Sequence, residues 1–422
     1  MLKVGMIGLG IRGCSLMRQI AKMDDVRIKV LCDLLPERID AATKSMQESV
    51  GYIPETVTDH RLVLADPEVD AVIISAAWDA HVDLAVEAME AGKYTAVEVG
   101  GAFTLEDCWR LVDTHERTGI HCMMLENCCY GRKEMLCLNL AQNGHLGQIV
   151  HCAGGYHHDL REEMVTEYAN KTSGCYRLPN YILRNCENYP THELGPIAKL
   201  LGINRGNRIV SLVSVASKAA GLHDYITRTH GFDSELAQMD FAQGDIITTV
   251  IRCARGETIT LTLDTTLPTA YSRGLSVHGT RGHYLEDNNT LFLERDEKTY
   301  KDPEQGRTKW SDNWNNAEDR YAEEYDHPLW KQYLADGVRG GHGGMDYLVL
   351  RAFLESVMEK KAPPIDVYDT ATWMAVSVLS EQSIAQGGVF VSMPDFTRGK
   401  WMKPHPEDYV EKYRLDVIPF KG

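Results

Sequence analysis

Apolar residues first gather near the amino terminus, in residues 4–7 and 27–32, and each run has the length of one buried β-strand. Between the two runs lies the segment Gly8-Leu9-Gly10-Ile11-Arg12-Gly13, followed by residues 15–23, whose composition is typical of a helix. The pattern predicts a strand, a glycine turn, a helix and a second strand, which is the first repeat of a parallel α/β sheet.

The glycines of this turn have separate tasks. Gly8 permits a tight turn, Gly10 lets a pyrophosphate approach the backbone, and Gly13 lets the helix pack closely on the strand. Asp33 ends the second strand, about 20 residues past Gly13, where a carboxylate can bond the ribose hydroxyls of NAD. Because no arginine follows Asp33 directly, NAD is preferred to NADP. The alternative is a glycine-rich turn in another kind of α/β protein.

Strand-like and helix-like patterns continue to alternate up to residue 127. The helix over 105–119 is opened by Thr104, with Asp107 three residues on, as in a capping box. We therefore expect a doubly wound parallel sheet, a Rossmann domain over residues 1–127, with ligands at the carboxyl ends of its strands. Ser75, Ala76, Glu98 and Val99 fall at those ends and are candidate neighbours of the nicotinamide ribose. The expected strands are 71–75, 95–99 and 120–125, and the other helices are 36–50 and 80–92.

From about Glu126 the pattern changes to an α+β domain with an open, mostly antiparallel sheet, which we place over residues 128–422. Alternating residues at 246–253 and 258–263 predict a hairpin around Ala254-Arg255-Gly256-Glu257. Residues 298–344 are polar and without periodicity, so a long loop is expected there. Further expected strands are 148–154, 208–216, 274–278, 283–286 and 291–294, and the expected helices are 133–143, 345–361 and 368–386.

Composition narrows the partners and the compartment. The net charge of −16 disfavours nucleic acid and anionic membranes, and no apolar run approaches membrane-spanning length. The 11 cysteines lack paired spacing, which indicates reduced thiols and a cytoplasmic protein, and the strand beginning at Met1 leaves no room for a signal peptide. His157-His158-Asp159 lacks further ligands at suitable spacing, so no metal is expected.

The order of these domains resembles the glucose-fructose oxidoreductase, inositol dehydrogenase and MocA superfamily over the whole chain. Its dehydrogenases carry Glu-Lys-Pro at the end of the fifth strand, where this chain has Glu98-Val99-Gly100. They also carry Asp four residues before a catalytic histidine, where this chain has Asn188 before His192. Since the lysine and the aspartate are absent while the NAD motif is intact, the resemblance implies that NAD serves another net reaction.

Six separated motifs resemble glycoside hydrolase family 109, whose members act as NAD-dependent N-acetylgalactosaminidases. The motifs are Glu126-Asn127-Cys128-Cys129-Tyr130, Gly155-Tyr156-His157-His158-Asp159-Leu160-Arg161, Tyr189-Pro190-Thr191-His192, Ala270-Tyr271-Ser272-Arg273-Gly274, His342-Gly343-Gly344-Met345-Asp346 and Pro394-Asp395-Phe396-Thr397-Arg398-Gly399. The resemblance implies catalytic roles for His192, Tyr189, Tyr271 and Tyr156. It further implies cofactor contacts from Ile11, Arg12, Trp78, His81 and Asn127, and substrate contacts from Tyr130, His158, Arg161 and His342.

NAD permits glycoside cleavage without two positioned carboxylates. Oxidation of the C3 hydroxyl acidifies the C2 proton, a base removes that proton, the glycosidic oxygen leaves, water adds, and C3 is reduced again. His and Tyr can supply the acid and the bases once their pKa values are shifted. We expect His192 to take the C3 hydroxyl proton, and the tyrosines' division of labour stays open. The alternatives are an NAD-dependent sugar or inositol dehydrogenase and an NAD-binding protein without catalysis.

A homo-oligomer, at least a dimer, is also expected, because an open sheet usually needs a cover for one of its faces. The alternation over residues 246–263 places Ile, Val and Leu on one side and Thr on the other, and the apolar side is the predicted patch between subunits.

Overall fold

A computed structural model describes residues 1–169, 176–294, 317–403 and 408–416 of the chain. The chain divides into two compact units. The first unit comprises Met1–Asn127, Gly337–Val378 and His405–Arg414, so it takes in two segments from beyond residue 127. The second unit comprises Cys128–Asp336, Leu379–Pro404 and Leu415–Gly422.

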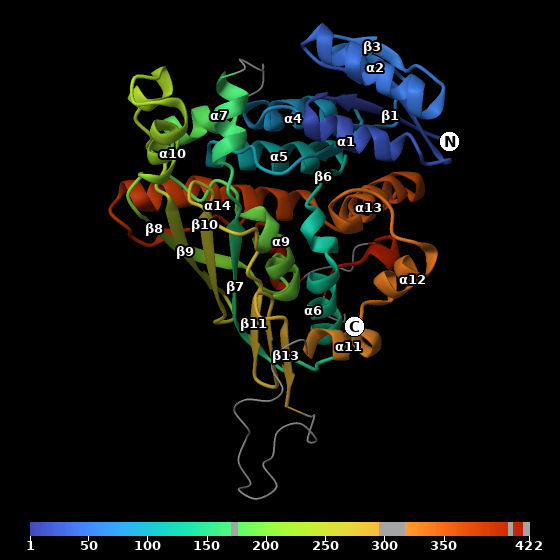
Figure 1. Ribbon diagram of the computed structural model, residues 1–422. Helices are drawn as coiled ribbons and strands as arrows, with labels where there is room; N and C mark the ends of the chain where they lie inside the picture. Colours follow the sequence, from blue (N-terminus) through green and yellow to red (C-terminus); the bar gives the residue numbers. More distant parts are fainter. Residues whose placement is uncertain (170–175, 295–316, 404–407, 417–422) are drawn as a thin grey trace, which may run out of the picture. The chain divides into compact units, whose positions relative to one another are not determined.

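The first unit contains a six-stranded parallel sheet with the strand order β3-β2-β1-β4-β5-β6 (Figure 1). The order reverses at β1, as in a doubly wound fold, and this confirms the predicted Rossmann sheet. Its strands are β1 (Leu2–Ile7), β2 (Val26–Cys32), β3 (Glu55–Val57), β4 (Ala71–Ile74), β5 (Tyr94–Val97) and β6 (Cys122–Met124). Its helices are α1 (Ile11–Ile20), α2 (Pro36–Val50), α3 (His60–Ala65), η1 (Trp78–Ala80), α4 (His81–Glu90), α5 (Leu105–Thr118), η4 (His342–Gly344), α13 (Met345–Glu359) and η6 (Glu411–Tyr413).

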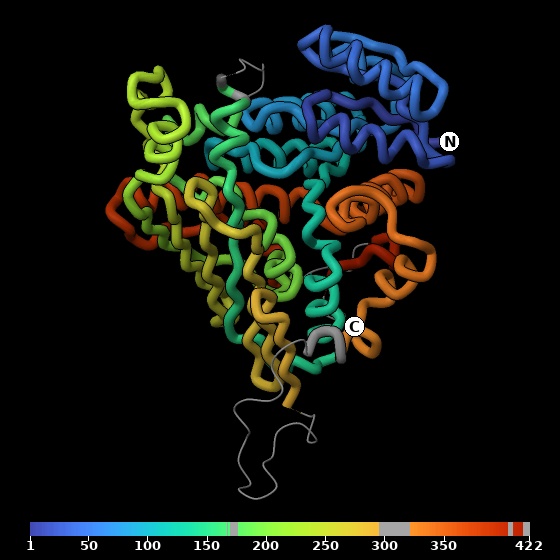
Figure 2. Tube along the Cα trace, viewed as in Figure 1, coloured from blue at the N-terminus to red at the C-terminus, as the bar shows by residue number. Residues whose placement is uncertain are grey.

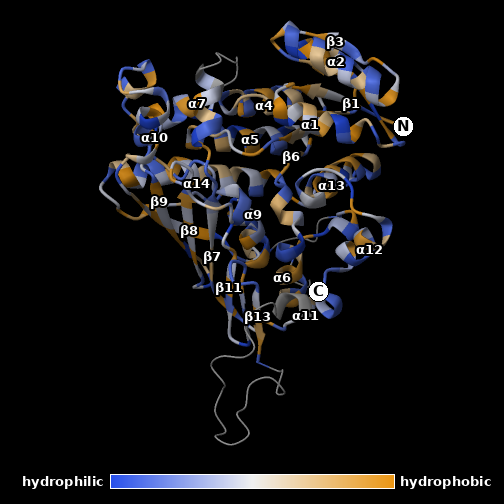
Figure 3. Ribbon diagram, viewed as in Figure 1, coloured by the Kyte–Doolittle hydropathy of each residue, from blue (hydrophilic) through white to orange (hydrophobic). Residues whose placement is uncertain are grey.

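Burial explains why the apolar runs became strands. All four residues of β4 are buried, and α1 buries one face through Leu16, Met17 and Ile20. Hydropathy colouring shows hydrophobic and hydrophilic residues mixed along α2 and α5, as expected for helices with one buried face (Figure 3). Thr104 and Asp107 cap α5 reciprocally, as predicted. The first helix begins at Ile11 rather than at Ser15, because Gly10 itself is its N-cap residue.

The second unit contains an eight-stranded sheet with the order β13-β12-β11-β7-β10-β9-β8-β14. Only β7 and β10 pair in parallel among the described strands of this sheet, so it is mostly antiparallel, as predicted. In the tube of Figure 2 the run from β9 to β13 is coloured from olive to gold, whereas β7 is teal to green and β14 is red. They are β7 (Ile149–His157), β8 (Ile209–Ala216), β9 (Ile246–Cys253), β10 (Thr258–Asp264), β11 (Ser276–Gly279), β12 (Gly282–Leu285), β13 (Thr290–Leu293) and β14 (Val391–Ser392).

The helices of this unit include two that the sequence did not indicate, in residues expected to form a loop. Residues 298–316 lie outside the described residues, but α11 (Ala317–Tyr325) and α12 (Pro328–Asp336) follow them, so the predicted loop up to residue 344 is wrong there. Trp330 is buried and its indole nitrogen donates to the carbonyl oxygen of Tyr130, 2.9 Å away, which anchors α12. The other helices are α6 (Arg132–Gln142), α7 (Arg161–Ala169), α8 (Arg177–Leu183), α9 (Thr191–Leu200), α10 (Gly221–His230), η3 (Glu235–Gln238) and η5 (Lys400–Met402). Two elements contain residues of both units, namely η2 (Asn127–Tyr130) and α14 (Val367–Ala385).

The predicted subunit patch on β9 and β10 is also wrong. Its apolar residues Ile247, Ile251, Ile259 and Leu261 are buried, because this side of the strands faces the core of the unit. The opposite side carries half-buried residues, chiefly threonines. None of the helices that the structure describes has the length and apolar composition needed to cross a membrane.

Candidate functional site

The glycine turn after β1 has the shape required to bind a dinucleotide. Gly8 has φ of 94°, and a Cβ atom on it would lie 2.4 Å from the carbonyl oxygen of Ser75. A Cβ atom on Gly13 would lie 2.1 Å from the carbonyl oxygen of Gly8, so α1 packs directly on the turn. At Gly10, by contrast, a Cβ atom would meet only a terminal nitrogen of Arg38, 3.8 Å away, and Ile11 beside it is 84 % exposed. The start of α1, with no acidic residue in its first turn, is therefore accessible to a pyrophosphate.

Asp33, at the end of β2, orders the chain on both sides of this turn. One carboxylate oxygen accepts the amide of Leu9 at 2.7 Å, and the other accepts the amide of Leu35 at 3.0 Å. Each oxygen keeps a second lone pair for a ribose hydroxyl. Arg38 lies 3.8 Å from the same carboxylate, although no arginine follows Asp33 directly in sequence. The glycine turn and the Asp33 carboxylate together form a site that fits the pyrophosphate and the ribose of NAD.

The ends of β4 and β5 are joined by His81. Its Nε2 lies 2.9 Å from the carbonyl oxygen of Ala76, and its Nδ1 lies 3.4 Å from that of Gly100. Burial lowers the pKa of His81 and favours the neutral ring. Ser75, in the same loop, donates its amide to Ile7 at 2.8 Å. The loop is thus fixed to two strands of the sheet.

Trp78 packs against the segment in which the superfamily's dehydrogenases carry Lys-Pro. Gly100 has φ of 84°, and a Cβ atom there would lie 2.6 Å from Nε1 of Trp78. Val99 is buried, and its amide donates to the carboxylate of Glu98 at 3.3 Å. The indole therefore lies where a side chain at residue 100 would begin.

Arg12 lies between two carboxylates of the first unit. Its Nε donates to Glu98 at 2.8 Å, and its two terminal nitrogens donate to Asp346 at 2.8 and 3.0 Å. Asp346 also accepts Nδ2 of Asn127 at 2.8 Å and contacts Nδ1 of His342 at 2.8 Å. These donors hold the pKa of the fully buried Asp346 carboxyl well below its usual range despite its burial. Sequence reasoning missed Asp346, although it quoted the motif that contains it.

The aromatic residues predicted to act in catalysis lie together in the second unit. The ring of Tyr156 is 4.5 Å from that of Tyr189 and 5.4 Å from that of His192, measured between centroids. Tyr189 and His192 are 4.8 Å apart, and Tyr271 is 6.4 Å from Tyr156. His158 belongs to the same cluster, since its Nδ1 lies 2.7 Å from the hydroxyl of Tyr156. The structure therefore brings all four catalytic candidates and His158 into one aromatic cluster.

Arg177, which the sequence analysis missed, brings positive charge to this aromatic cluster. Its guanidinium carbon lies 5.4 Å from the ring centre of Tyr189. Burial raises the pKa of the Tyr156 phenol, and the charge of Arg177 opposes that rise. Burial likewise raises the pKa of Tyr271, opposed by Arg273. The tyrosines thus differ in the cation that can stabilise each phenolate. No sequence pattern marks Arg177, which begins the short helix α8.

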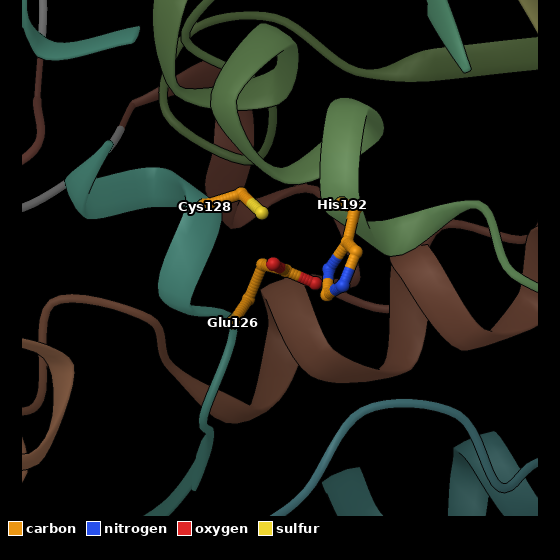
Figure 4. A group of neighbouring side chains, drawn as sticks. All are labelled: Glu126, Cys128 and His192. Atoms are coloured by element: carbon orange, nitrogen blue, oxygen red, sulfur yellow. The ribbon is translucent and has the colours of Figure 1, made fainter. Parts of the chain in front are cut away.

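Two further groups adjoin the aromatic cluster. Cys128 and His192 come from η2 and α9, and the thiol sulfur lies within 4.8 Å of a ring nitrogen (Figure 4). Glu126, also labelled in that figure, belongs to the first unit. Glu187, two residues before Tyr189, is 1 % exposed. Burial raises the pKa of its carboxyl to about 8, with a backbone hydrogen bond to Tyr189 acting against the rise.

A buried ion cluster supports the segments that carry these residues. Arg273 donates to Glu134 at the start of α6 and to Glu193, which follows His192, at 3.0 Å. One oxygen each of Glu134, Glu193 and Glu286 lies within 4.8 Å of the others, as in a possible metal site. The guanidinium of Arg273 already provides a cation there, and the expectation of no metal remains a prediction.

Two substrate candidates have other partners. Arg161 makes an ion pair with Asp159 at 2.7 Å and stacks over the ring of Tyr225 at 4.9 Å. Tyr130 is fully buried, and its carbonyl oxygen accepts from the indole of Trp330. Their substrate roles, like that of His342, remain predictions.

Comparisons with known proteins agree with this architecture. Residues 130–403 match the family description "Glycosyl hydrolase 109, C-terminal domain", and residues 2–125 match "Oxidoreductase family, NAD-binding Rossmann fold". An alpha-N-acetylgalactosaminidase of Tannerella forsythia is 37 % identical over 96 % of this chain and 88 % of its own length. A second protein of that name, from Shewanella oneidensis, is 36 % identical over 96 % of this chain and 87 % of its own.

Solved structures show the same fold at lower identity. Levoglucosan dehydrogenase in complex with NADH and levoglucosan has a TM-score of 0.67 and 18 % identity, over 93 % of this chain and 99 % of that one. A probable dehydrogenase from Thermotoga maritima has a TM-score of 0.62 and 17 % identity, over 93 % and 98 %. With the Rossmann match, these relations establish NAD as the cofactor. The chain belongs to glycosyl hydrolase family 109.

Proposed function

We propose that the chain is a redox-neutral, NAD-dependent glycoside hydrolase that acts on an N-acetylgalactosaminide or another hexoside. The aromatic cluster of His192, Tyr156, Tyr189 and Tyr271 is the observation that carries the proposal. An ordinary glycosidase needs two positioned carboxylic acids, whereas this cluster offers an imidazole and three phenols. The relatives named alpha-N-acetylgalactosaminidase support the sugar.

When bound, NAD supplies the reversible oxidation of a sugar hydroxyl, which makes the neighbouring C–H bond acidic. In our proposal, Gly8, Gly10, Gly13 and Asp33 hold the cofactor. His192 accepts the proton of the C3 hydroxyl at a ring nitrogen. One phenol then removes the C2 proton, and another donates a proton to the departing glycosidic oxygen.

The charges beside the phenols support a division of labour between base and acid. Arg177 lies beside Tyr156 and Tyr189, and a nearby cation stabilises a phenolate, so either tyrosine has help in acting as a base. Tyr271 is 54 % exposed, and its hydroxyl is only 3.5 Å from a terminal nitrogen of Arg273. The assignment of the three tyrosines stays open.

The first experiment asks whether sugar is released without consumption of NAD. Purified protein is incubated with aryl glycosides of both anomers in deuterated water, without added cofactor. We expect release of the aryl alcohol and one deuterium at C2 of the free sugar. Release without C2 deuterium would contradict the elimination step.

Two substitutions separate the stages of the reaction. His192→Ala should fold and bind NAD but lose roughly 100-fold or more in turnover, because a general base contributes about that much. Tyr271→Phe should leave C3 oxidation intact, so the absorbance of the reduced cofactor should accumulate when substrate is added, whereas His192→Ala should show no such signal. An active His192→Ala enzyme would overturn the assignment of this base.

The second candidate function is an NAD-dependent sugar or inositol dehydrogenase. The fold shared with levoglucosan dehydrogenase favours it. A steady rise of reduced-cofactor absorbance with substrate and excess NAD, without release of an aryl alcohol, would support this alternative and contradict the glycosidase.

We further propose that the protein acts in the cytoplasm as a homo-oligomer, without nucleic-acid or membrane partners. The charge of −16 supports the lack of polyanionic partners. Val215, Val389 and Phe390 are exposed apolar side chains that contact with a second subunit would bury. A monomer mass by light scattering at micromolar concentration would contradict the oligomer.

A further inference from the structure

We infer that Asp346 and His342 are positioning residues of the cofactor site, acting through Arg12 of the glycine turn. The inference rests on the NAD dependence of the proposed function and not on which bond is cleaved. It moves His342 from the substrate role suggested by its motif to the nucleotide-binding unit, in which its segment lies.

The first support is the geometry around Arg12. The carboxylate of Asp346 accepts both terminal nitrogens of the guanidinium, a bidentate pair that fixes the plane as well as the position of the group. Glu98 accepts Nε from another side. Three N–H donors are thereby used and two remain, one of them on Nη1, which also lies 3.5 Å from Nδ1 of His342. Arg12 belongs to the turn that the NAD phosphates approach, so these carboxylates set the direction in which its remaining donors point.

The second support is the number of contacts made by one carboxylate. Besides Arg12, Asp346 contacts Asn127, His342 and, at 3.3 Å, Nε2 of Gln19. Arg12, Glu98 and Asn127 are all predicted cofactor residues, and each is bonded to Asp346 or to Arg12. Asp346 is fully buried, so its charge is compensated by these donors alone and not by water.

The third support comes from the segment before α13. A Cβ atom on Gly340 would lie 2.4 Å from the side-chain oxygen of Gln19 in α1, and one on Gly341 would lie 2.8 Å from Asp346. His342 itself adopts φ of 50°, which is unusual for a residue with a side chain. Its ring stays 57 % exposed while Nδ1 bonds Asp346. The glycine-rich segment thus packs closely against the last turn of α1, at Gln19, and against Asp346.

The competing explanation is that Asp346 only ties α13 to the sheet. A second ion pair between α13 and the sheet, in the same unit, provides the control that tests this explanation. Arg351, also in α13, contacts the Asp25 carboxylate at 2.8 and 2.9 Å, just before β2 and apart from the glycine turn. Asp25→Asn therefore removes a tie between α13 and the sheet without touching the predicted cofactor residues.

The experiment measures NAD binding by calorimetry on the full chain stripped of cofactor, without substrate. Asp346→Asn should raise the NAD dissociation constant roughly 10-fold or more. Each factor of ten corresponds to a loss of about 1.4 kcal/mol of binding free energy. His342→Ala should raise the dissociation constant by a smaller factor, and Asp25→Asn should bind NAD like the unaltered chain. Circular dichroism of each cofactor-free variant reports whether it is folded.

Two outcomes would overturn the inference: folded Asp346→Asn that binds NAD as tightly as Asp25→Asn, or equal weakening in both variants. If Asp346→Asn does not fold, His342→Ala decides, since an exposed ring can be removed without unfolding the chain, and unchanged NAD affinity in that variant would then overturn the inference. A chain that shows the expected ranking but releases no sugar would contradict the proposed function and leave this inference intact.

Discussion

Each unit of the molecule contains a charge cluster around a buried ionised group, and the two clusters differ in composition. In the first unit the carboxylate of Asp346 receives donors from Arg12, Asn127 and His342, and Arg12 also donates to Glu98. In the second unit a single guanidinium, that of Arg273, serves Glu134 and Glu193, with Glu286 close by. Donors are thus plentiful in one cluster, and acceptors are in excess in the other.

The difference between the two clusters is reflected in the pKa values of their carboxyl groups. The pKa of Asp346 is depressed by its donors, so this carboxylate stays ionised at neutral pH. In the second unit, burial and then Glu134 raise the pKa of Glu286, and burial raises that of Glu187 to about 8. A site that holds a cofactor needs constant charge, whereas a site that moves protons needs groups with displaced pKa values. The comparison therefore supports the proposal that the acid–base chemistry belongs to the second unit.

The largest expected effect is that of Arg273→Met. Removing the one guanidinium leaves buried carboxylates uncompensated, which typically costs about 3 to 5 kcal/mol. Urea unfolding should show this loss at neutral pH. The control is Arg184→Met in the same unit. Arg184 donates to one oxygen of Glu381, whose side chain is 34 % exposed, so its loss should cost less. A loss below that of the control would contradict the excess of negative charge.

Glu187→Gln should change how stability depends on pH. A carboxyl whose pKa is raised on folding stabilises the native state fully below its unfolded pKa of 4.5, and the contribution is lost as pH rises through about 8. The free energy of unfolding of the unaltered chain should therefore fall across that window, by about 1.4 kcal/mol for each pH unit. The free energy of unfolding of Glu187→Gln should not show this fall with rising pH. The exposed Glu48 provides the control substitution, and parallel curves for both variants would refute the assignment.

Glu286→Gln should have the smallest effect, and in the stabilising direction. The substitution removes one acceptor charge from the Arg273 cluster, and a glutamine oxygen can still accept the amide of Leu275, now bonded at 3.0 Å. Because Glu286 is only partly buried, we expect a gain of about 1 kcal/mol or less above neutral pH. Chemical unfolding at two pH values measures it, and a loss of stability at the higher pH would contradict the comparison.

The sequence predicted the first sheet well because β1, β4 and β5 are almost wholly buried, so their residues are mostly apolar and β4 is an unbroken apolar run. The β9–β10 hairpin was predictable from its alternation and from the turn at Gly256. Helix α9, which carries His192, was not predicted, because Pro190 precedes it and Pro196 lies inside it. Packing overrides that local signal, since nearly every residue of α9 is buried.

The residues of the candidate site also divide into those that local sequence patterns predict and those that depend on the packing of distant segments. Gly8, Gly13 and Asp33 were predictable because their spacing alone determines a local shape. Asp346 lies 334 residues from Arg12, so their contact leaves no periodic trace in the sequence. The conjunction of Arg177 with the tyrosines depends likewise on how distant segments pack, and a sequence pattern cannot show it.

The backbone conformation at Gly100 restricts the substitutions that could recreate the Lys-Pro segment of the dehydrogenases. Restoring the superfamily's Lys-Pro would place proline at a residue whose φ is 84°, while a proline ring requires about −65°. The new ring would also collide with the indole of Trp78. A single exchange of Val99 for lysine would therefore not recreate the dehydrogenase segment. Conversion to a net oxidoreductase would require rebuilding this loop together with η1, so the two chemistries are separated by several simultaneous changes rather than by one side chain.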